Sequence, residues 1–382
     1  MELAPYLRLM VQRNGSDLYF STGAAPHVKI SGQTVAIGDK PLMTGDVSSL
    51  AYSIMNDEQI REFEGTMECN LAISVASLGR FRVNVFRQRG DVAMVIRFIR
   101  GEIPSIEELY LPQTLKRLIM EKRGLILVVG STGSGKSTTL ASMIDHRNQH
   151  ATGHILSIED PIEFLHQHKK SVVNQREIGL DSMSYENALK NALREAPDVI
   201  LIGEIRDAAT MQHAIAYAET GHLCLSTLHA NNANQALDRI VNFFPDSAHR
   251  QILNDLSLNL RAVVSQRLVP TVDGGRRAAI ELLIQSSYTA ELIQKGKIHE
   301  IKEAMEQGGE RGMMTFDQSL YDLYTEGAIS LEEALNHADS RNNLALRIRL
   351  NGNSGAKPQH NPRPAKAAAS ETPRDPEMMI TG

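Results

Sequence analysis

Residues 130–137 read Gly-Ser-Thr-Gly-Ser-Gly-Lys-Ser, and this stretch decides the fold of the chain. It follows the apolar run Leu-Ile-Leu-Val-Val at residues 125–129 and precedes a helical pattern, which is the setting of a phosphate-binding loop between a buried strand and a helix. The backbone N–H groups of such a loop and the helix N-terminus hold phosphates. A chance match in a turn rich in Gly and Ser would lack the flanking strand and helix, so the sequence predicts a P-loop.

Two side chains of this loop have individual expected roles. Lys136 should place its charge on the β- and γ-phosphates, and the Ser137 hydroxyl should bind Mg²⁺. ATP and Mg²⁺ are therefore the expected substrate and cofactor. The full set of loop residues expected to contact the nucleotide is Ser131, Thr132, Gly133, Ser134, Gly135, Lys136, Ser137 and Thr138.

Short apolar runs alternate with helical patterns after the loop. Together with residues 125–129, the runs are residues 155–158, 199–202 and 223–225. Unbroken apolar runs between helices are typical of strands that are buried on both faces, so the sequence predicts an α/β fold with a parallel sheet. Residues 254–268 and 331–338 are predicted to be helical.

Acidic residues follow two of these predicted strands. Residues 155–158 lead into Glu159, Asp160 and Glu163, and residues 199–203 lead into Glu204. Ligands of open α/β sheets bind at the carboxyl ends of the strands, where a carboxylate can hold Mg²⁺ or orient the attacking water. Gly203 stands where many P-loop enzymes have the Walker B aspartate, so Glu204 is the predicted metal-side acid.

A histidine follows a further predicted strand, in the stretch Ser-Thr-Leu-His at residues 226–229. His229 could contact the γ-phosphate of a bound nucleotide. A structural histidine whose ring is satisfied by backbone groups is the commoner case, so both interpretations stay open at this point.

The two ends of the chain differ from its middle. Residues 1–100 carry alternating strand patterns of a mixed α/β domain, residues 101–111 form a linker that begins with Gly and Pro, and residues 112–350 form the domain of the P-loop. Residues 351–382 are rich in Pro, Ala, Ser, Gly and Asn, and they are predicted to be a disordered tail.

The composition excludes several classes of protein. Two cysteines in 382 residues cannot make a disulfide framework or a CxxC zinc site. No stretch resembles a signal peptide or approaches 18 consecutive apolar residues, so a cytoplasmic protein is expected. A net charge of −5 and 5% aromatic residues argue against nucleic acid as a partner.

Four stretches resemble the signature boxes of the secretion ATPase superfamily, namely residues 130–139, 158–164, 193–207 and 220–230. The stretches at residues 15–21 and 79–84 narrow the resemblance to type IV pilus retraction ATPases of the PilT kind. The resemblance covers roughly residues 3–345, and the C-terminal tail makes it closest to the PilU paralogues.

The resemblance implies an N-terminal PAS-like domain, a C-terminal RecA-like domain, and a ring hexamer with ATP between subunits. The implied partners are a sibling retraction ATPase and the inner-membrane platform protein of the pilus, which places the chain at the cytoplasmic base of that machine. The implied roles are catalytic glutamate for Glu163, Walker B acid for Glu204, His-box contacts for His222 and His229, and nucleotide contacts for Arg82 and Arg97. From the strand pattern alone, these two arginines would be solvated or interface charges.

One departure from the family pattern concerns the C-terminal part. Retraction motors of this family typically carry Ala-Ile-Arg-Asn/Ser-Leu-Ile, whereas residues 288–293 here read Tyr-Thr-Ala-Glu-Leu-Ile, with Ala290 in the arginine position. This difference implies that the protein assists a sibling motor.

Three alternatives to a retraction ATPase remain. A pilus extension or type II secretion ATPase usually carries a four-cysteine metal site, which two cysteines cannot supply. A non-hydrolysing support subunit is disfavoured by the intact Lys136, Glu163 and Glu204, but the Ala290 substitution leaves it open. A DNA-handling RecA-like enzyme is disfavoured by the acidic charge and the few aromatic residues.

Overall fold

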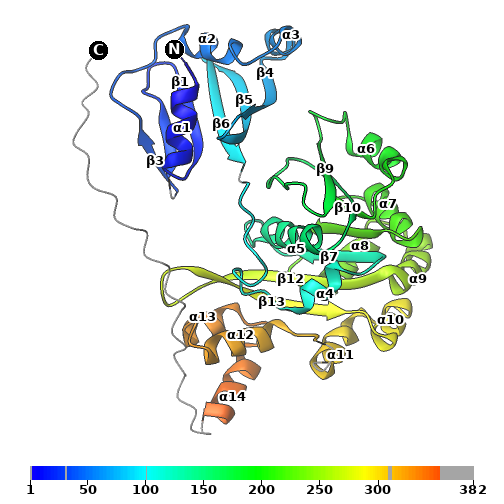
Figure 1. Ribbon diagram of the computed structural model, residues 1–382. Coiled ribbons are helices and arrows are strands. Elements are labelled where there is room, and N and C mark those ends of the chain that lie inside the picture. Colours follow the sequence, from blue (N-terminus) through cyan, green and yellow to red (C-terminus); the bar gives the residue numbers. More distant parts are fainter. Residues whose placement is uncertain (1, 31, 100, 309–311, 353–382) are drawn as a thin grey trace.

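The computed structural model describes residues 2–30, 32–99, 101–308 and 312–352. Two α/β units follow one another along the chain, and a segment without regular helix or strand joins them (Figure 1). The predicted α/β fold class is therefore confirmed. Most of the predicted tail, residues 353–382, lies outside the described residues, and Asn351 at its start belongs to the last helix.

The N-terminal unit is a six-stranded sheet in the order β3-β2-β1-β6-β5-β4, and every neighbouring pair is antiparallel. Its core is built from inward-facing side chains of alternate strand positions, such as Leu18 and Phe20 or Phe81 and Val83. Its elements are α1 (Ala4–Gln12), β1 (Gly15–Ser21), β2 (His27–Ile30), β3 (Gln33–Ala36), α2 (Asp46–Tyr52), α3 (Asp57–Thr66), β4 (Glu68–Val75), β5 (Gly79–Gln88) and β6 (Asp91–Ile99).

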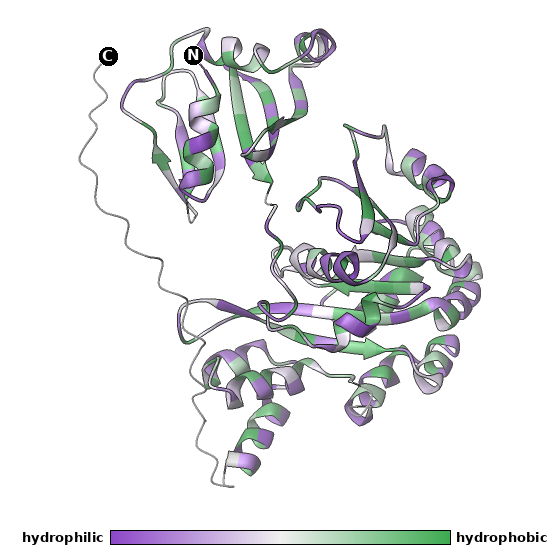
Figure 2. Ribbon diagram, viewed as in Figure 1, coloured by the Kyte–Doolittle hydropathy of each residue, from purple (hydrophilic) through white to green (hydrophobic). Residues whose placement is uncertain are grey.

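The C-terminal unit is built on a seven-stranded sheet in the order β13-β12-β7-β11-β10-β8-β9. All pairs are parallel except β12 with β13. The strands are β7 (Gly124–Val129), β8 (Gly153–Glu159), β9 (Ser171–Glu177), β10 (Val199–Glu204), β11 (Leu223–Leu228), β12 (Leu260–Pro270) and β13 (Arg276–Ile284). The central strands are almost entirely apolar (Figure 2).

Strand β7 is buried on both faces, as its apolar run predicts. Leu125, Leu127 and Val129 pack into one core cluster, whereas Ile126 and Val128 pack into another. The helices of this unit cover the sheet, and the P-loop lies between the carboxyl end of β7 and the helix that follows it. They are α4 (Thr114–Ile119), α5 (Lys136–His150), α6 (Tyr185–Ala192), α7 (Ala208–Glu219), α8 (Ala233–Val241) and α9 (His249–Asn259).

The predicted helix over residues 254–268 is wrong in its second half. Helix α9 ends at Asn259, and residues 260–270 form β12, which pairs in parallel with β7 and antiparallel with β13. The apolar residues of this stretch fit a buried strand as well as a buried helix. Pairing on both sides satisfies the backbone of this run as a strand. The predicted helix at residues 331–338 is confirmed as α13 (Leu331–His337).

The C-terminal helices are α10 (Ser287–Gln294), α11 (Ile301–Gln307), α12 (Phe316–Thr325), α13 and α14 (Arg341–Gly352). Helix α12 packs against β13, and α13 packs against β12. Arg267 of β12 contacts this region, since its Nη2 lies 2.7 Å from Asp339 Oδ1 and its guanidinium lies 3.8 Å from the centre of the Phe316 ring.

Among the described residues, none of the helices combines the length and the apolar character needed to cross a bilayer.

Candidate functional site

The P-loop can turn tightly because glycine occupies two positions where its backbone lies very close to other atoms. A Cβ atom on Gly130 would lie 2.4 Å from Ser134 Oγ, and one on Gly135 would lie 2.7 Å from Gln266 Nε2. Gly135 also has a φ of 92°, in the left-handed region that favours glycine. Gln266 supports the loop from β12, since its Oε1 accepts a hydrogen bond of 2.7 Å from Thr139 Oγ1 on α5.

Lys136 is the buried cation of the loop. Its Nζ donates to the carbonyl oxygens of Gly130 and Ser131, at 2.9 Å each. Burial lowers the pKa of its ammonium group, and the negative charges of Glu204 and Glu163 oppose that shift. These opposing effects mean that both acids lie within electrostatic reach of the lysine, as expected if the three residues serve one site.

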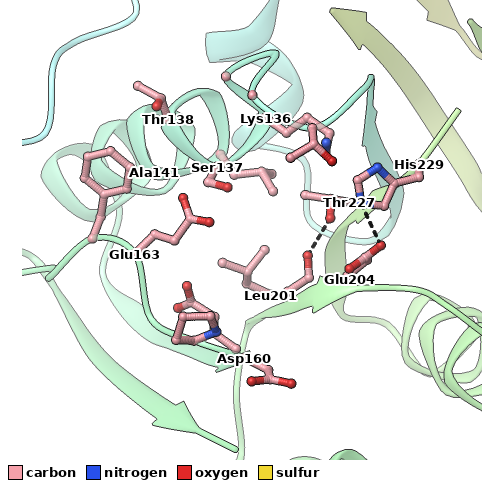
Figure 3. Close-up of a pocket in the computed structure, with 18 of the residues that line it drawn as sticks. Lys136, Ser137, Thr138, Ala141, Asp160, Glu163, Leu201, Glu204, Thr227 and His229 are labelled. Carbon is pink, nitrogen blue, oxygen red and sulfur yellow. Dashed lines mark hydrogen bonds and ion pairs between the residues drawn. The ribbon is translucent and has the colours of Figure 1, made fainter. Parts of the chain in front are cut away.

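A cavity of about 480 Å³ lies against the loop. Its walls come from α5 and from the carboxyl ends of β8, β10 and β11, where Figure 3 shows Lys136, Ser137, Glu163 and Glu204 around one central space. The predicted loop residues that line it are Thr132, Gly133, Gly135, Lys136, Ser137 and Thr138. Ser131 lines an adjoining cavity of about 700 Å³, and Ser134 is buried within the loop.

Glu204 reaches this cavity because strand β10 is irregular at Gly203. The pairing with β11 passes from Ile202 opposite Ser226 to Glu204 opposite Thr227, so Gly203 is an extra residue, and such a bulge re-aims the next side chain. A Cβ atom on Gly203 would lie only 3.0 Å from Tyr185 Oη. An aspartate would not fit there without a shift, and this explains why the acid stands one position later.

The carboxylate of Glu204 has two partners. Its Oε1 lies 3.1 Å from His229 Nε2, and its Oε2 accepts a hydrogen bond of 2.7 Å from Arg206 Nε. The contact with His229 is drawn in Figure 3. The ring of His229 therefore has a carboxylate partner inside the cavity, which is more than the backbone contact of a merely structural histidine.

Three acids at or after the end of β8, Glu159, Asp160 and Glu163, also line the cavity. Glu163 lies on the side of Ser137 in Figure 3. Burial raises the pKa of Glu159 to about 7, and the hydrogen bonds from Ser157 and Gln175 oppose that shift. Glu159 was visible in the sequence as the acid at the end of an apolar run, but sequence reasoning assigned it no role. The negative charge of Glu163 adds a smaller raising effect on the pKa of Glu159.

His222 does not belong to this cavity. It precedes β11, and its carbonyl accepts from Gly124 N at the start of β7, whereas the P-loop and His229 follow the ends of the two strands. Six residues of strand separate the two edges by about 20 Å. Its Nδ1 lies 3.2 Å from Tyr217 O and 3.1 Å from Thr220 Oγ1. The fold therefore places His222 away from the cavity of its own chain, and its contact with nucleotide stays a prediction.

Arg82 and Arg97 face each other as a cross-strand pair on β5 and β6. Neither arginine is among the described residues that line the cavity. Arg97 Nε lies 2.7 Å from Oδ1 of the buried Asp17, and Arg82 Nε lies 4.0 Å from Oε1 of the buried Glu177 on β9. Arg82 thus faces the C-terminal unit, whereas Arg97 is held within the N-terminal sheet. Their contact with nucleotide stays a prediction.

These placements predict different effects for the two arginines. We expect Arg82→Ala to lower ATP turnover by about 10²-fold or more, as the loss of an arginine that reaches phosphate would, with little change in unfolding temperature. Arg97→Ala should lower the unfolding temperature of the N-terminal unit, because it leaves the buried Asp17 without its counter-ion. Steady-state phosphate release and thermal unfolding of both variants check this. Unchanged turnover in Arg82→Ala would leave that residue a surface charge.

The cavity wall carries oxygen donors of the kind that bind Mg²⁺. No group of three or more His, Cys, Asp or Glu side chains within the described ranges could hold a metal ion by itself. The Ser137 hydroxyl and the Glu204 carboxylate on the cavity wall are hard oxygen donors, and such donors suit Mg²⁺ that completes its shell with phosphate and water.

Several known proteins resemble this chain over most of its length. The profile of a family described as "Type II/IV secretion system protein" matches residues 80–337. The type IV pilus ATPase PilU of Pseudomonas aeruginosa is 55% identical over 357 residues, 93% of this chain and 94% of that protein. The type IV pilus retraction ATPase PilT of the same organism is 42% identical over 334 residues, which cover 87% of this chain and 97% of that protein. The crystal structure of the pilus retraction motor PilT with bound ADP superimposes with a TM-score of 0.84 and 42% identity, over 91% of this chain and 99% of that one.

Proposed function

Because this chain belongs to the family of type II/IV secretion system proteins, we propose that it is an ATPase that powers or assists the retraction of type IV pili. The observation that carries the proposal is the meeting of Lys136, Ser137, Glu163 and Glu204 in one cavity at the end of β7. The similarity to PilU and PilT extends over nearly the whole chain and supports retraction over the alternatives.

Each side chain of the cavity has a place in ATP hydrolysis. Lys136 leaves the loop carbonyls of Gly130 and Ser131 and places its charge on the β- and γ-phosphates. Glu163 orients the attacking water and accepts its proton. Charge that develops on the phosphoryl oxygens is neutralised by Lys136 and by an arginine of the N-terminal unit.

The residues present fit Mg²⁺ on the phosphate side of the cavity. Ser137 would hold the ion directly and Glu204 would hold it directly or through water. When bound, Mg²⁺ supplies positive charge to the phosphates. His229 and Arg206 keep the Glu204 carboxylate on the cavity wall, and each of its oxygens keeps a further lone pair that could face the ion or its water shell.

The proposed assembly is a ring hexamer at the cytoplasmic base of the pilus machine. ATP would bind between subunits, and its hydrolysis would rotate domains against the inner-membrane platform protein to release pilins. A sibling retraction ATPase is the proposed co-worker, because Ala290 on α10 replaces an arginine whose planar, fork-shaped donor group alanine cannot imitate. The intact catalytic acids disfavour a non-hydrolysing support subunit.

The direction of the motor can be tested genetically. In cells that lack this gene, we expect surface pili to be present but to retract less often or with less force, because the protein acts in disassembly. Fluorescent labelling of pili and counting of retraction events measure this, and complementation with the Lys136→Ala variant should not restore retraction. Loss of all surface pili would indicate an assembly role. Vigorous retraction in cells with this protein and no sibling motor would contradict the dependence.

A further inference from the structure

A buried carboxylate lies between the N-terminal unit and the loop that carries Glu163. Glu177 is the last residue of β9 and is only 3% exposed. The β8–β9 register places it opposite Glu159, and Ile178 N donates to Glu159 O at 2.9 Å. Glu177 is not among the residues that line the cavity, so it would act through its neighbours.

One oxygen of Glu177 holds the catalytic loop. Ile162 N donates a hydrogen bond of 3.3 Å to Glu177 Oε2, and Ile162 directly precedes Glu163 in the chain. The side chain of Ile162 is also buried, at 4% exposure, so this part of the loop is fixed by packing and by one buried hydrogen bond. The position of the Glu163 carboxylate in Figure 3 thus depends on where Glu177 lies.

The other oxygen of Glu177 faces the N-terminal sheet. Arg82 Nε lies 4.0 Å from Oε1, which is an ion pair but too long for a direct hydrogen bond. The charges of Arg82 and Arg80 both act to lower the pKa of Glu177, against the larger raising effect of its burial. An ion pair of this length favours the position of the Arg82 side chain beside Glu177, and it is weak enough for Arg82 to leave that position.

We propose that Glu177 is a positioning residue, which holds the loop that carries Glu163 and retains Arg82 until that arginine moves to the phosphates. This inference rests on the proposed ATPase function. The Glu177 carboxylate would then couple the position of the N-terminal unit, through Arg82, to the position of the loop that carries Glu163. Nucleotide and Glu177 then compete for one guanidinium, so the pairing lowers the apparent nucleotide affinity by the fraction of Arg82 that it retains.

Two substitutions separate the two contacts. Glu177→Ala removes both, and we expect kcat to fall about 10- to 100-fold while KM for ATP stays within about threefold, because the loop loses its anchor. Glu177→Gln keeps an oxygen that can accept from Ile162 N, so its kcat should stay within about threefold of the parent. The matched control is Glu195→Gln, which breaks the 2.7 Å ion pair of the neighbouring Arg176 without touching the loop.

The retention of Arg82 has its own readout. Glu177→Gln should tighten the binding of a fluorescent, non-hydrolysable ATP analogue about threefold or more, because Arg82 is no longer held back. The same substitution in an Arg82→Ala background should leave the affinity unchanged. Damage to the fold would weaken binding, and it would do so in both backgrounds.

The outcomes are distinguishable. A normal kcat in Glu177→Ala, or an equal loss in Glu177→Gln and Glu177→Ala, overturns the positioning of the Glu163 loop. An affinity that is unchanged, or that changes equally with and without Arg82, overturns the retention. Lys136→Ala is measured alongside. If that variant hydrolyses ATP normally, the proposed ATPase site is wrong, and the Glu177 proposal, which rests on that site, is overturned with it.

Discussion

Replacing Lys136 with alanine should reduce ATP turnover by at least about 100- to 1000-fold, the cost of removing one preorganised charge from a phosphoryl-transfer site. The loss should be large because Lys136 is 9% exposed and acts where water does not screen its charge. Its Nζ also bridges Gly130 and Ser131, so the loop loses two hydrogen bonds as well as the cation. Nucleotide affinity should fall together with the rate.

The matched control is Lys190→Ala. This lysine also pairs with a carboxylate, Glu186, but it lies on the exposed face of α6 with 60% of its side chain accessible. We expect it to keep the turnover and the unfolding temperature of the parent protein. Phosphate release, nucleotide titration and thermal unfolding of both variants decide the matter, and normal turnover in purified Lys136→Ala would refute the P-loop assignment.

The second large effect should come from Glu163→Gln and Glu204→Gln. Both changes keep the shape of the side chain and remove its charge, so ATP should bind within a few-fold of the parent affinity while kcat falls by about 100-fold or more. The two acids should then differ in one respect. Glu204→Gln should raise the Mg²⁺ concentration needed for half-maximal rate about tenfold, and Glu163→Gln should not, because only Glu204 is proposed to hold the ion.

Separate nucleotide titrations and turnover assays over a range of Mg²⁺ concentrations test these roles. Glu186→Gln is the control, because it neutralises a glutamate that is 68% exposed and lies outside the cavity. If both active-site variants lose affinity and rate to the same extent, the proposed division between metal binding and water activation is wrong.

The interior of the central sheet could be predicted from the sequence, whereas its edges could not. Strands β7, β10 and β11 are covered on both faces, so each appears as an unbroken apolar run. The edge strands β9 and β13 mix buried and exposed positions. Strand β12 mixes apolar and polar residues and was predicted to be helical, because its pairing with β7 and β13 joins residues that are far apart in the chain.

The candidate site shows the same division between local and long-range information. The loop residues follow directly after β7 and Glu204 is the last residue of β10, so the sequence predicts their place at one edge of the sheet. His222 and His229 lie in one short stretch of sequence, but the six residues of β11 between them put the two side chains at opposite edges of the sheet. Glu177 went unnoticed because its importance depends on the pairing of β8 with β9 and on an arginine of the other unit.

Strand β12 also has a mechanical consequence. Its adjacent residues Gln266 and Arg267 point to opposite faces of the sheet. Gln266 contacts Thr139 on the helix that follows the P-loop, and Arg267 pairs with Asp339 in the C-terminal helical region. A paired strand is stiff along its length. A displacement of the phosphate loop relative to the C-terminal helices would therefore strain the contacts of two adjacent residues, so β12 is a direct mechanical link between them.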